Sequence, residues 1–111
     1  MTEIEQFGDD FLPFNEKGIS KVPAVAGTFI LADKARQLIY IGFGTNLNKI
    51  LMDVKKTSNV CLGRASYYQV AMNPNPLEGA ARMFSEYREA HSGMIPRCNK
   101  FDLSVNIGRL P

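Results

Sequence analysis

The side chains best suited to metal binding or nucleophilic catalysis in this 111-residue chain are two cysteines and one histidine. Cys61 and Cys98 form no CxxC pair and belong to no His/Cys cluster, which argues against a zinc site. We expect both to remain thiols in an intracellular protein, with a structural disulfide as the less favoured alternative. His91 stands in no acid-and-nucleophile pattern, so we expect it on the surface at a helix C-terminus.

Two glycines, Gly42 and Gly44, follow a strand-like segment and precede a helix-like one. Glycines in that setting let a backbone approach the pyrophosphate of a dinucleotide. The third glycine of that fingerprint would fall at Leu47, and no second strand–helix–strand unit follows. We therefore reject a dinucleotide site.

The net charge of +2 is too small an excess to indicate a nucleic-acid partner by itself. Its distribution is uneven, because residues 1–21 hold five acids and two lysines whereas the rest of the chain holds eleven bases and six acids. One interpretation is a cationic binding face that the acidic leader partly shields; a solvated surface is the one we favour. The candidate binding cations are Lys49, Lys55, Lys56 and Arg64.

Three segments have the composition of strands. Residues 25–31 and 37–42 are rich in β-branched, leucine and aromatic residues, and a short polar connection of hairpin length separates them. They should pair antiparallel. Residues 64–71 predict a third strand.

Two segments have the periodicity of amphipathic helices. In the first, Thr45 or Asn46 is available as the cap, and the apolar stripe is Leu47, Ile50, Leu51 and Val54. In the second, Asn75 is the expected cap, Pro76 opens the helix, and Glu78 can reach back to the cap amide. Its expected buried stripe is Leu77, Ala80, Ala81, Phe84 and the stem of Arg88. Gly93 is placed to end it.

This order of elements predicts an α+β fold, a small three-stranded antiparallel sheet flanked by helices. We expect residues 1–21 to be an irregular acidic leader that packs on a domain of residues 22–111 through its apolar side chains, which are Phe7, Phe11, Leu12, Phe14 and Ile19. No apolar run is long enough to span a membrane, and the acidic start is unlike a secretory signal. We expect a cytoplasmic protein.

Two tripeptides of the paired strands carry a resemblance: Gly27-Thr28-Phe29 in the first and Tyr40-Ile41-Gly42 in the second. Together with the elements around them, they resemble the GIY-YIG nuclease domain. The elements that extend the match are Val22-Pro23, the segment 45–49, Tyr67-Tyr68, Gly93, Ile95-Pro96 and Asn99. The resemblance spans roughly Val22 to Lys100.

The resemblance implies an active site of a tyrosine, an arginine ten residues later, a metal-binding glutamate on the next helix and an asparagine after it. Tyr40 fills the tyrosine position and Asn99 the asparagine position. Ile50 stands at the arginine position and Ala80 at the glutamate position, and neither side chain can stabilise charge or ligate Mg²⁺. Phe29 replaces the tyrosine of the first tripeptide.

The retained residues also have structural interpretations. Tyr40 is more typical of a packing residue than of a nucleophile activator. We expect Gly42, a candidate binding residue through its backbone, to end its strand in a shape that a side chain would hinder. We expect Asn99 to tie the chain after the second helix by hydrogen bonds to backbone.

We therefore predict a GIY-YIG-like domain without nuclease activity or a cofactor, which binds nucleic acid or another protein. The alternative is a metal-dependent endonuclease with rearranged residues, in which Lys49 or Arg64 supplies the cation and Mg²⁺ is bound. Glu78 would face away from such a site because it lies about 200° around the helix from Ala80. A third possibility is a small-ligand or structural module in which Ile50 and Ala80 close the cleft or make it apolar.

Overall fold

The computed structural model describes residues 11–99, and the structural statements below refer to that part of the chain. Its sheet has four antiparallel strands in the order β1-β4-β2-β3. They are β1 (Leu12–Pro13), β2 (Gly27–Ala32), β3 (Leu38–Gly44) and β4 (Tyr67–Met72). The α+β class is confirmed. The sheet has one strand more than expected because two residues of the leader pair with β4.

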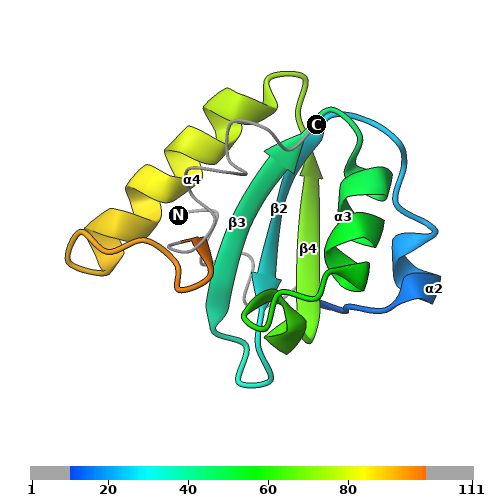
Figure 1. The fold of residues 1–111 in the computed structure, drawn as a ribbon. Coiled ribbons are helices and arrows are strands. Elements are labelled where there is room, and N and C mark those ends of the chain that lie inside the picture. Colours follow the sequence, from blue (N-terminus) through cyan, green and yellow to red (C-terminus); the bar gives the residue numbers. More distant parts are fainter. Residues whose placement is uncertain (1–10, 100–111) are drawn as a thin grey trace.

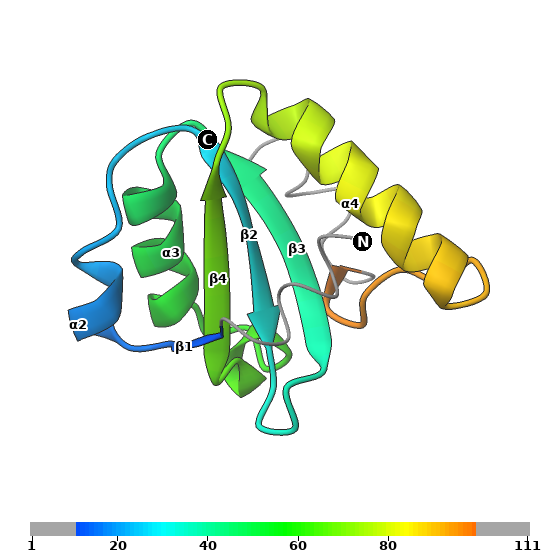
Figure 2. The same ribbon diagram turned by 180° about the vertical axis from the view of Figure 1, so that it is seen from behind.

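Helices cover both faces of the sheet (Figures 1 and 2). They are α2 (Glu16–Ile19), α3 (Leu47–Lys56) and α4 (Pro76–Ala90), and a short 3-10 turn, η1 (Leu62–Arg64), precedes β4. Figure 1 shows α3 and α2 on one side of the sheet and α4 on the other.

The leader is not irregular throughout, because β1 and α2 lie within it. Phe14 and Ile19 from it are buried, Leu12 is half exposed, and Phe7 lies outside the described residues.

Two hydrophobic clusters correspond to the two faces. The α3 side holds Phe29, Leu31 and Tyr40 from the strands together with the whole predicted stripe of α3, Leu47, Ile50, Leu51 and Val54. The α4 side holds Ile30, Ile41, Phe43, Ala80 and Met83. Successive residues of a regular strand point to opposite faces, so Phe29, Ile30 and Leu31 of β2 alternate between the two clusters. In β3 the register is irregular near Ile39, which belongs to the same cluster as Tyr40.

The hairpin between β2 and β3 is built around one side chain. The Asp33 carboxylate accepts hydrogen bonds from the backbone N–H groups of Ala35 (2.9 Å) and Gln37 (3.0 Å). Arg36 has a φ of 64° and so closes the turn in the left-handed region. The predicted antiparallel pairing is confirmed, from Gly27 opposite Gly44 to Leu31 opposite Tyr40.

Helix α3 begins where the sequence predicts. The Asn46 side chain accepts a hydrogen bond from the N–H of Lys49 at 3.0 Å, which identifies Asn46 rather than Thr45 as the cap.

Helix α4 faces the sheet through a stripe that matches the predicted one only in part. Ala80 is buried as predicted, together with Gly79 and Met83, whereas Leu77 is 61% exposed. Ala81 and Arg88 are also exposed, and Phe84 is only partly buried. Small side chains at 79 and 80 let the helix approach the sheet closely, and a Cβ at Gly79 would crowd Asn73 and Thr28.

The ends of α4 agree only in part with the prediction. Asn75 and Pro76 open the helix, but the Asn75 side chain makes no capping hydrogen bond. Gly93, with a φ of 84°, follows the last turn, and its N–H donates to the carbonyl of Arg88. His91 is the exposed C-cap and stacks on Tyr87, which confirms its predicted place.

Within residues 11–99, no helix is long and apolar enough to cross a membrane.

Candidate functional site

Tyr40 and Ile50 both belong to the hydrophobic cluster on the α3 side. Both are 1% exposed, one on β3 and the other on α3. The Tyr40 ring packs on Phe29 with 5.9 Å between ring centroids. The position implied for an arginine is therefore filled by a buried hydrocarbon side chain in the same cluster as the buried tyrosine.

Ala80 lies in the other cluster. Its side chain packs against Ile30, Ile41 and Phe43 on the α4 side. The sheet therefore separates it from Tyr40 and Ile50, and the four implied positions do not form one cleft. The third possibility named above, in which Ile50 and Ala80 together close a cleft or make it apolar, does not hold for this reason.

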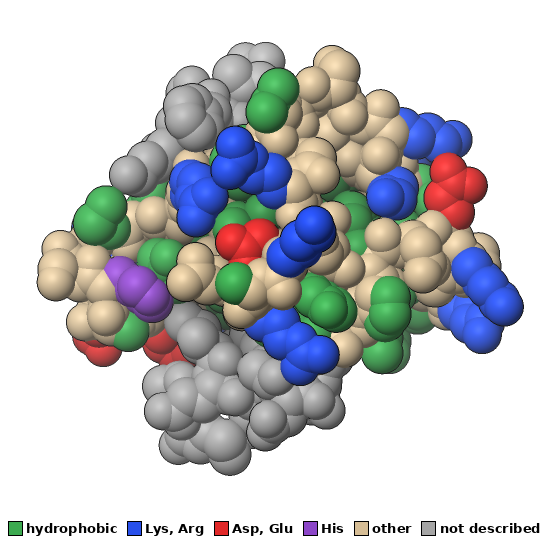
Figure 3. All heavy atoms as spheres, turned by 90° about the horizontal axis from the view of Figure 1, so that it is seen from below, with side chains coloured by type: hydrophobic (Ala, Val, Ile, Leu, Met, Phe, Trp, Pro, Cys, Tyr) green, Lys and Arg blue, Asp and Glu red, His purple; other side chains and the backbone are tan. Residues whose placement is uncertain are grey.

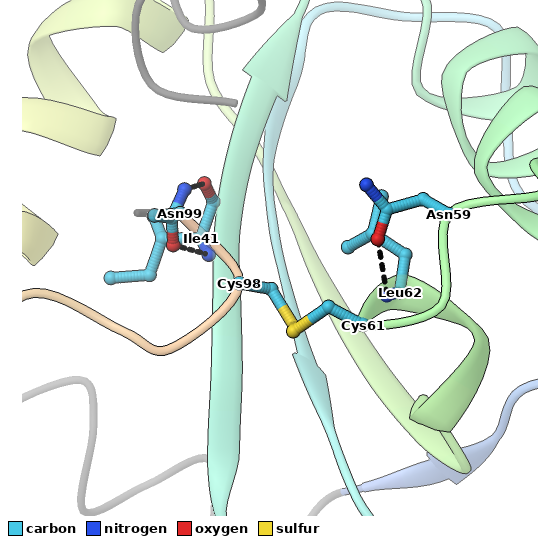
Figure 4. Close-up of a disulfide and its surroundings, with 6 residues drawn as sticks. All are labelled: Ile41, Asn59, Cys61, Leu62, Cys98 and Asn99. Carbon is cyan, nitrogen blue, oxygen red and sulfur yellow. Dashed lines mark hydrogen bonds between the residues drawn. A yellow bond between two sulfur atoms is a disulfide. The ribbon is translucent and has the colours of Figure 1, made fainter. Parts of the chain in front are cut away.

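Asn99 is fully buried against the outer edge of β3. Its Oδ1 accepts a hydrogen bond from the N–H of Ile41 at 2.9 Å, and its Nδ2 donates to the carbonyl of Ile41 at 3.0 Å. Figure 4 shows this pair beside the strand. The predicted tie between Asn99 and a backbone is confirmed, and the amide is satisfied on both sides.

Gly42 is required for a reason other than the expected one. The strand continues past it to Gly44, and Gly42 stands directly opposite Phe29 in the register. A Cβ at position 42 would overlap the Phe29 ring. The absence of a side chain at Gly42 therefore leaves space for the Phe29 ring of the neighbouring strand. The expectation that Gly42 ends the strand is wrong.

The four candidate cations are exposed but differ in their surroundings. Lys49 pairs with Asp53 at 3.2 Å, and Lys55 lies over the ring of Phe14, 5.3 Å from its centroid. Lys56 is the last residue of α3, and Arg64 is the last residue of η1. Figure 3 shows the face that contains the β2–β3 hairpin and η1, where Lys and Arg side chains are spread among uncharged side chains and some acidic ones. Lys49 is the one of the four that an acid partly neutralises.

The two cysteines form a disulfide, so the expectation of free thiols is wrong. Cys61 and Cys98 have Cα atoms 5.6 Å apart, within the usual range for a bridge. The bond joins the segment after α4 to the loop before η1 (Figure 4). The sequence shows two cysteines but gives no sign that they meet, since their pairing depends on how the chain wraps around β3.

A divalent cation is implied by the resemblance, and the donor set for it can be tested in the described residues. Ala80 stands at the implied glutamate position, and its side chain is a methyl group, which cannot ligate a cation. No group of three or more His, Cys, Asp or Glu side chains within residues 11–99 could hold a metal ion. These residues therefore do not fit a catalytic divalent cation.

Comparison with known proteins shows a likeness in structure alone. Neither a family model nor a curated protein matches the chain in sequence. Among solved structures, it is similar to the GIY-YIG N-terminal endonuclease domain of UvrC from Thermotoga maritima, in two point mutants bound to the catalytic divalent cation. Each match has a TM-score of 0.53 and covers 73% of this chain and 89% of the other, at 19% and 18% identity. This protein therefore has a GIY-YIG-like fold.

Proposed function

We propose that this protein binds nucleic acid without cleaving it. The observation that supports the absence of cleavage is the buried Ile50, in the same cluster as Tyr40, where the resemblance implies an arginine. Phosphodiester hydrolysis needs groups that stabilise charge on the phosphoryl oxygens and on the leaving group. Hydrocarbon at 50 and 80 supplies neither of them.

Binding is supported by the charge of the described residues. Residues 11–99 contain eleven Lys and Arg against six Asp and Glu, and Lys49 to Asp53 is the single salt bridge among them. The candidate cations Lys56 and Arg64 have no acidic partner among these residues and are thus available to phosphates. The solved structures of similar fold are endonuclease domains, whose substrate is a nucleic acid.

The first experiment measures cleavage. Supercoiled DNA is incubated with the protein and either Mg²⁺ or Mn²⁺, and the expected result is no nicking above that of the Tyr40→Phe variant. Nicking that requires the metal and disappears in Tyr40→Phe would show instead an endonuclease with rearranged residues.

The second experiment measures binding to a mixed-sequence DNA by fluorescence anisotropy. Affinity should fall steeply between about 50 and about 200 mM salt, because bound phosphates release counterions. Lys56→Gln should weaken binding more than Lys49→Gln, since Asp53 already neutralises Lys49. Arg82→Gln, on the exposed side of α4, is the matched control. Negligible affinity at low salt would contradict the proposal and leave a protein partner as the remaining version of a binding module.

A further inference from the structure

A surface hollow of about 440 Å³ lies next to the disulfide. Among the described residues it is lined by Asn59, Val60, Cys61, Arg64 and Arg97. The first four come from the segment around η1, and Arg97 comes from the segment after α4. Arg64 is three residues from Cys61, and Arg97 is next to Cys98, so the disulfide brings the two arginines to one site.

Both charged side chains of the hollow are hydrogen-bond donors. Arg64 and Arg97 are exposed and form no salt bridge within residues 11–99. The Oδ1 atom of Asn59 already accepts a hydrogen bond from the N–H of Leu62 at 3.0 Å, which leaves its Nδ2 to donate. No acidic side chain lines the hollow in the described part of the chain. Two guanidinium groups and an amide N–H₂ together favour an anion with several acceptor oxygens.

The rest of the lining is apolar. Val60 is 77% exposed and stands next to Cys61. A hollow of this volume is within the range of small-ligand sites, large enough for a phosphate group and part of the molecule that carries it.

We propose that this hollow is a phosphate-binding site, in which Arg64 and Arg97 hold the phosphate oxygens and Val60 packs against the attached organic group. That the phosphate belongs to a nucleic-acid chain rests on the function proposed above. A free phosphate compound would satisfy the same donors, so the test separates the two sources.

The test uses two probes on the whole protein. Fluorescence anisotropy measures the Kd for a labelled single-stranded DNA of about twelve nucleotides, a length within the range of single-strand sites. NMR follows the Nε–Hε signals of the arginines during titration with inorganic phosphate. The variants are Arg64→Gln, Arg97→Gln and, as a matched control outside the hollow, Arg82→Gln. Thermal unfolding of each variant shows that it is folded.

The expected result is that Arg64→Gln and Arg97→Gln each raise the Kd for DNA roughly tenfold, the size of one lost charged hydrogen bond. Arg82→Gln should leave the Kd unchanged, and phosphate should move the signals of Arg64 and Arg97 but not that of Arg82. Wild-type DNA binding that both hollow variants retain would overturn the phosphate site and leave the proposed function standing. Phosphate shifts at Arg64 and Arg97 without DNA binding would support the site, with a free phosphate compound as its ligand, and overturn the proposed function. Neither DNA binding nor phosphate shifts would overturn both.

Discussion

The Asn99 side chain pairs with both backbone groups of Ile41, accepting from the N–H and donating to the carbonyl. This amide does for the edge of β3 what a further strand would do, because it satisfies the two polar groups that face outward at that point. The asparagine implied by the resemblance is thus present as a structural residue, and its role can be measured without reference to catalysis.

Replacing Asn99 by Ala should lower the free energy of unfolding by about 2–4 kcal/mol, since two buried backbone groups lose their partners. Urea denaturation measures the loss. The matched control is Asn75→Ala, which removes an exposed amide that makes no capping bond and should cost about 0.5 kcal/mol or less. Equal losses in both variants would contradict the role assigned to Asn99.

Reduction of the disulfide should also destabilise the fold. A bridge between residues 37 apart in sequence restricts the unfolded chain by about 3–4 kcal/mol in the loop-entropy account. Denaturation midpoints with and without a thiol reductant measure the difference, and a Cys61→Ser/Cys98→Ser variant should be insensitive to the reductant. Disulfides are rare in the cytoplasm. The bridge and the predicted cytoplasmic location therefore conflict, and a free-thiol assay on protein from intact cells tests them together. Blocked thiols would support the bridge and contradict the cytoplasmic location.

An arginine placed at position 50 should not create a nuclease. The site is 1% exposed within a cluster of apolar side chains, so Ile50→Arg buries a charge and should cost about 3 kcal/mol or more of stability. Ile50→Leu keeps the volume and should cost less than about 1.5 kcal/mol. Thermal unfolding and the nicking assay together decide the matter; a stable Ile50→Arg variant that nicks DNA would contradict this description of the site.

The contact between Gly42 and Phe29 predicts a coupled pair of substitutions. Gly42→Ala should destabilise the protein by about 1–3 kcal/mol, because the new Cβ meets the Phe29 ring. In a Phe29→Leu background the smaller side chain leaves room, so the same change should cost less. A double-mutant cycle measures the coupling, and additive losses would mean that the two positions act independently.

Stability should fall at alkaline pH partly through Tyr68. Burial raises the pKa of this phenol above 10 in the folded protein. From the unfolded value near 10 up to the folded pKa, the unfolded chain loses a proton that the native protein keeps, so unfolding becomes more favourable as the pH rises. The slope of unfolding free energy against pH in that range should be shallower in Tyr68→Phe. If the slope is the same in Tyr68→Phe, the loss of stability at alkaline pH comes from other groups, such as the lysines.

Local chemistry in the sequence predicted much of this structure. The spacing of Leu47, Ile50, Leu51 and Val54 identified the buried face of α3, and Asn46 was one of two expected caps. These features depend on neighbours in the chain. The stripe of α4 was predicted only in part: Ala80 is buried as expected, but hydrophobicity favoured Leu77, whereas the packing selected Gly79 and Met83.

The candidate site was harder to predict because it depends on contacts between distant segments. Counting residues along the sequence assigned Tyr40, Ile50, Ala80 and Asn99 to the four positions of one implied active site. Only the folded sheet shows that Ala80 lies on the opposite face from Tyr40 and Ile50. The path of the segment after α4 around β3 brings Cys98 to Cys61. It also brings Arg97 to the hollow that Arg64 lines.

That wrapping segment has a consequence for how copies of this protein meet. An uncovered outermost strand presents a row of unpaired N–H and C=O groups to which a strand of another molecule can add. Here the N–H of Cys98 donates to the carbonyl of Ile39 at 2.9 Å, and Asn99 occupies both groups of Ile41. The middle of β3 is therefore closed to strand addition, which protects the protein from edge-to-edge aggregation at that point.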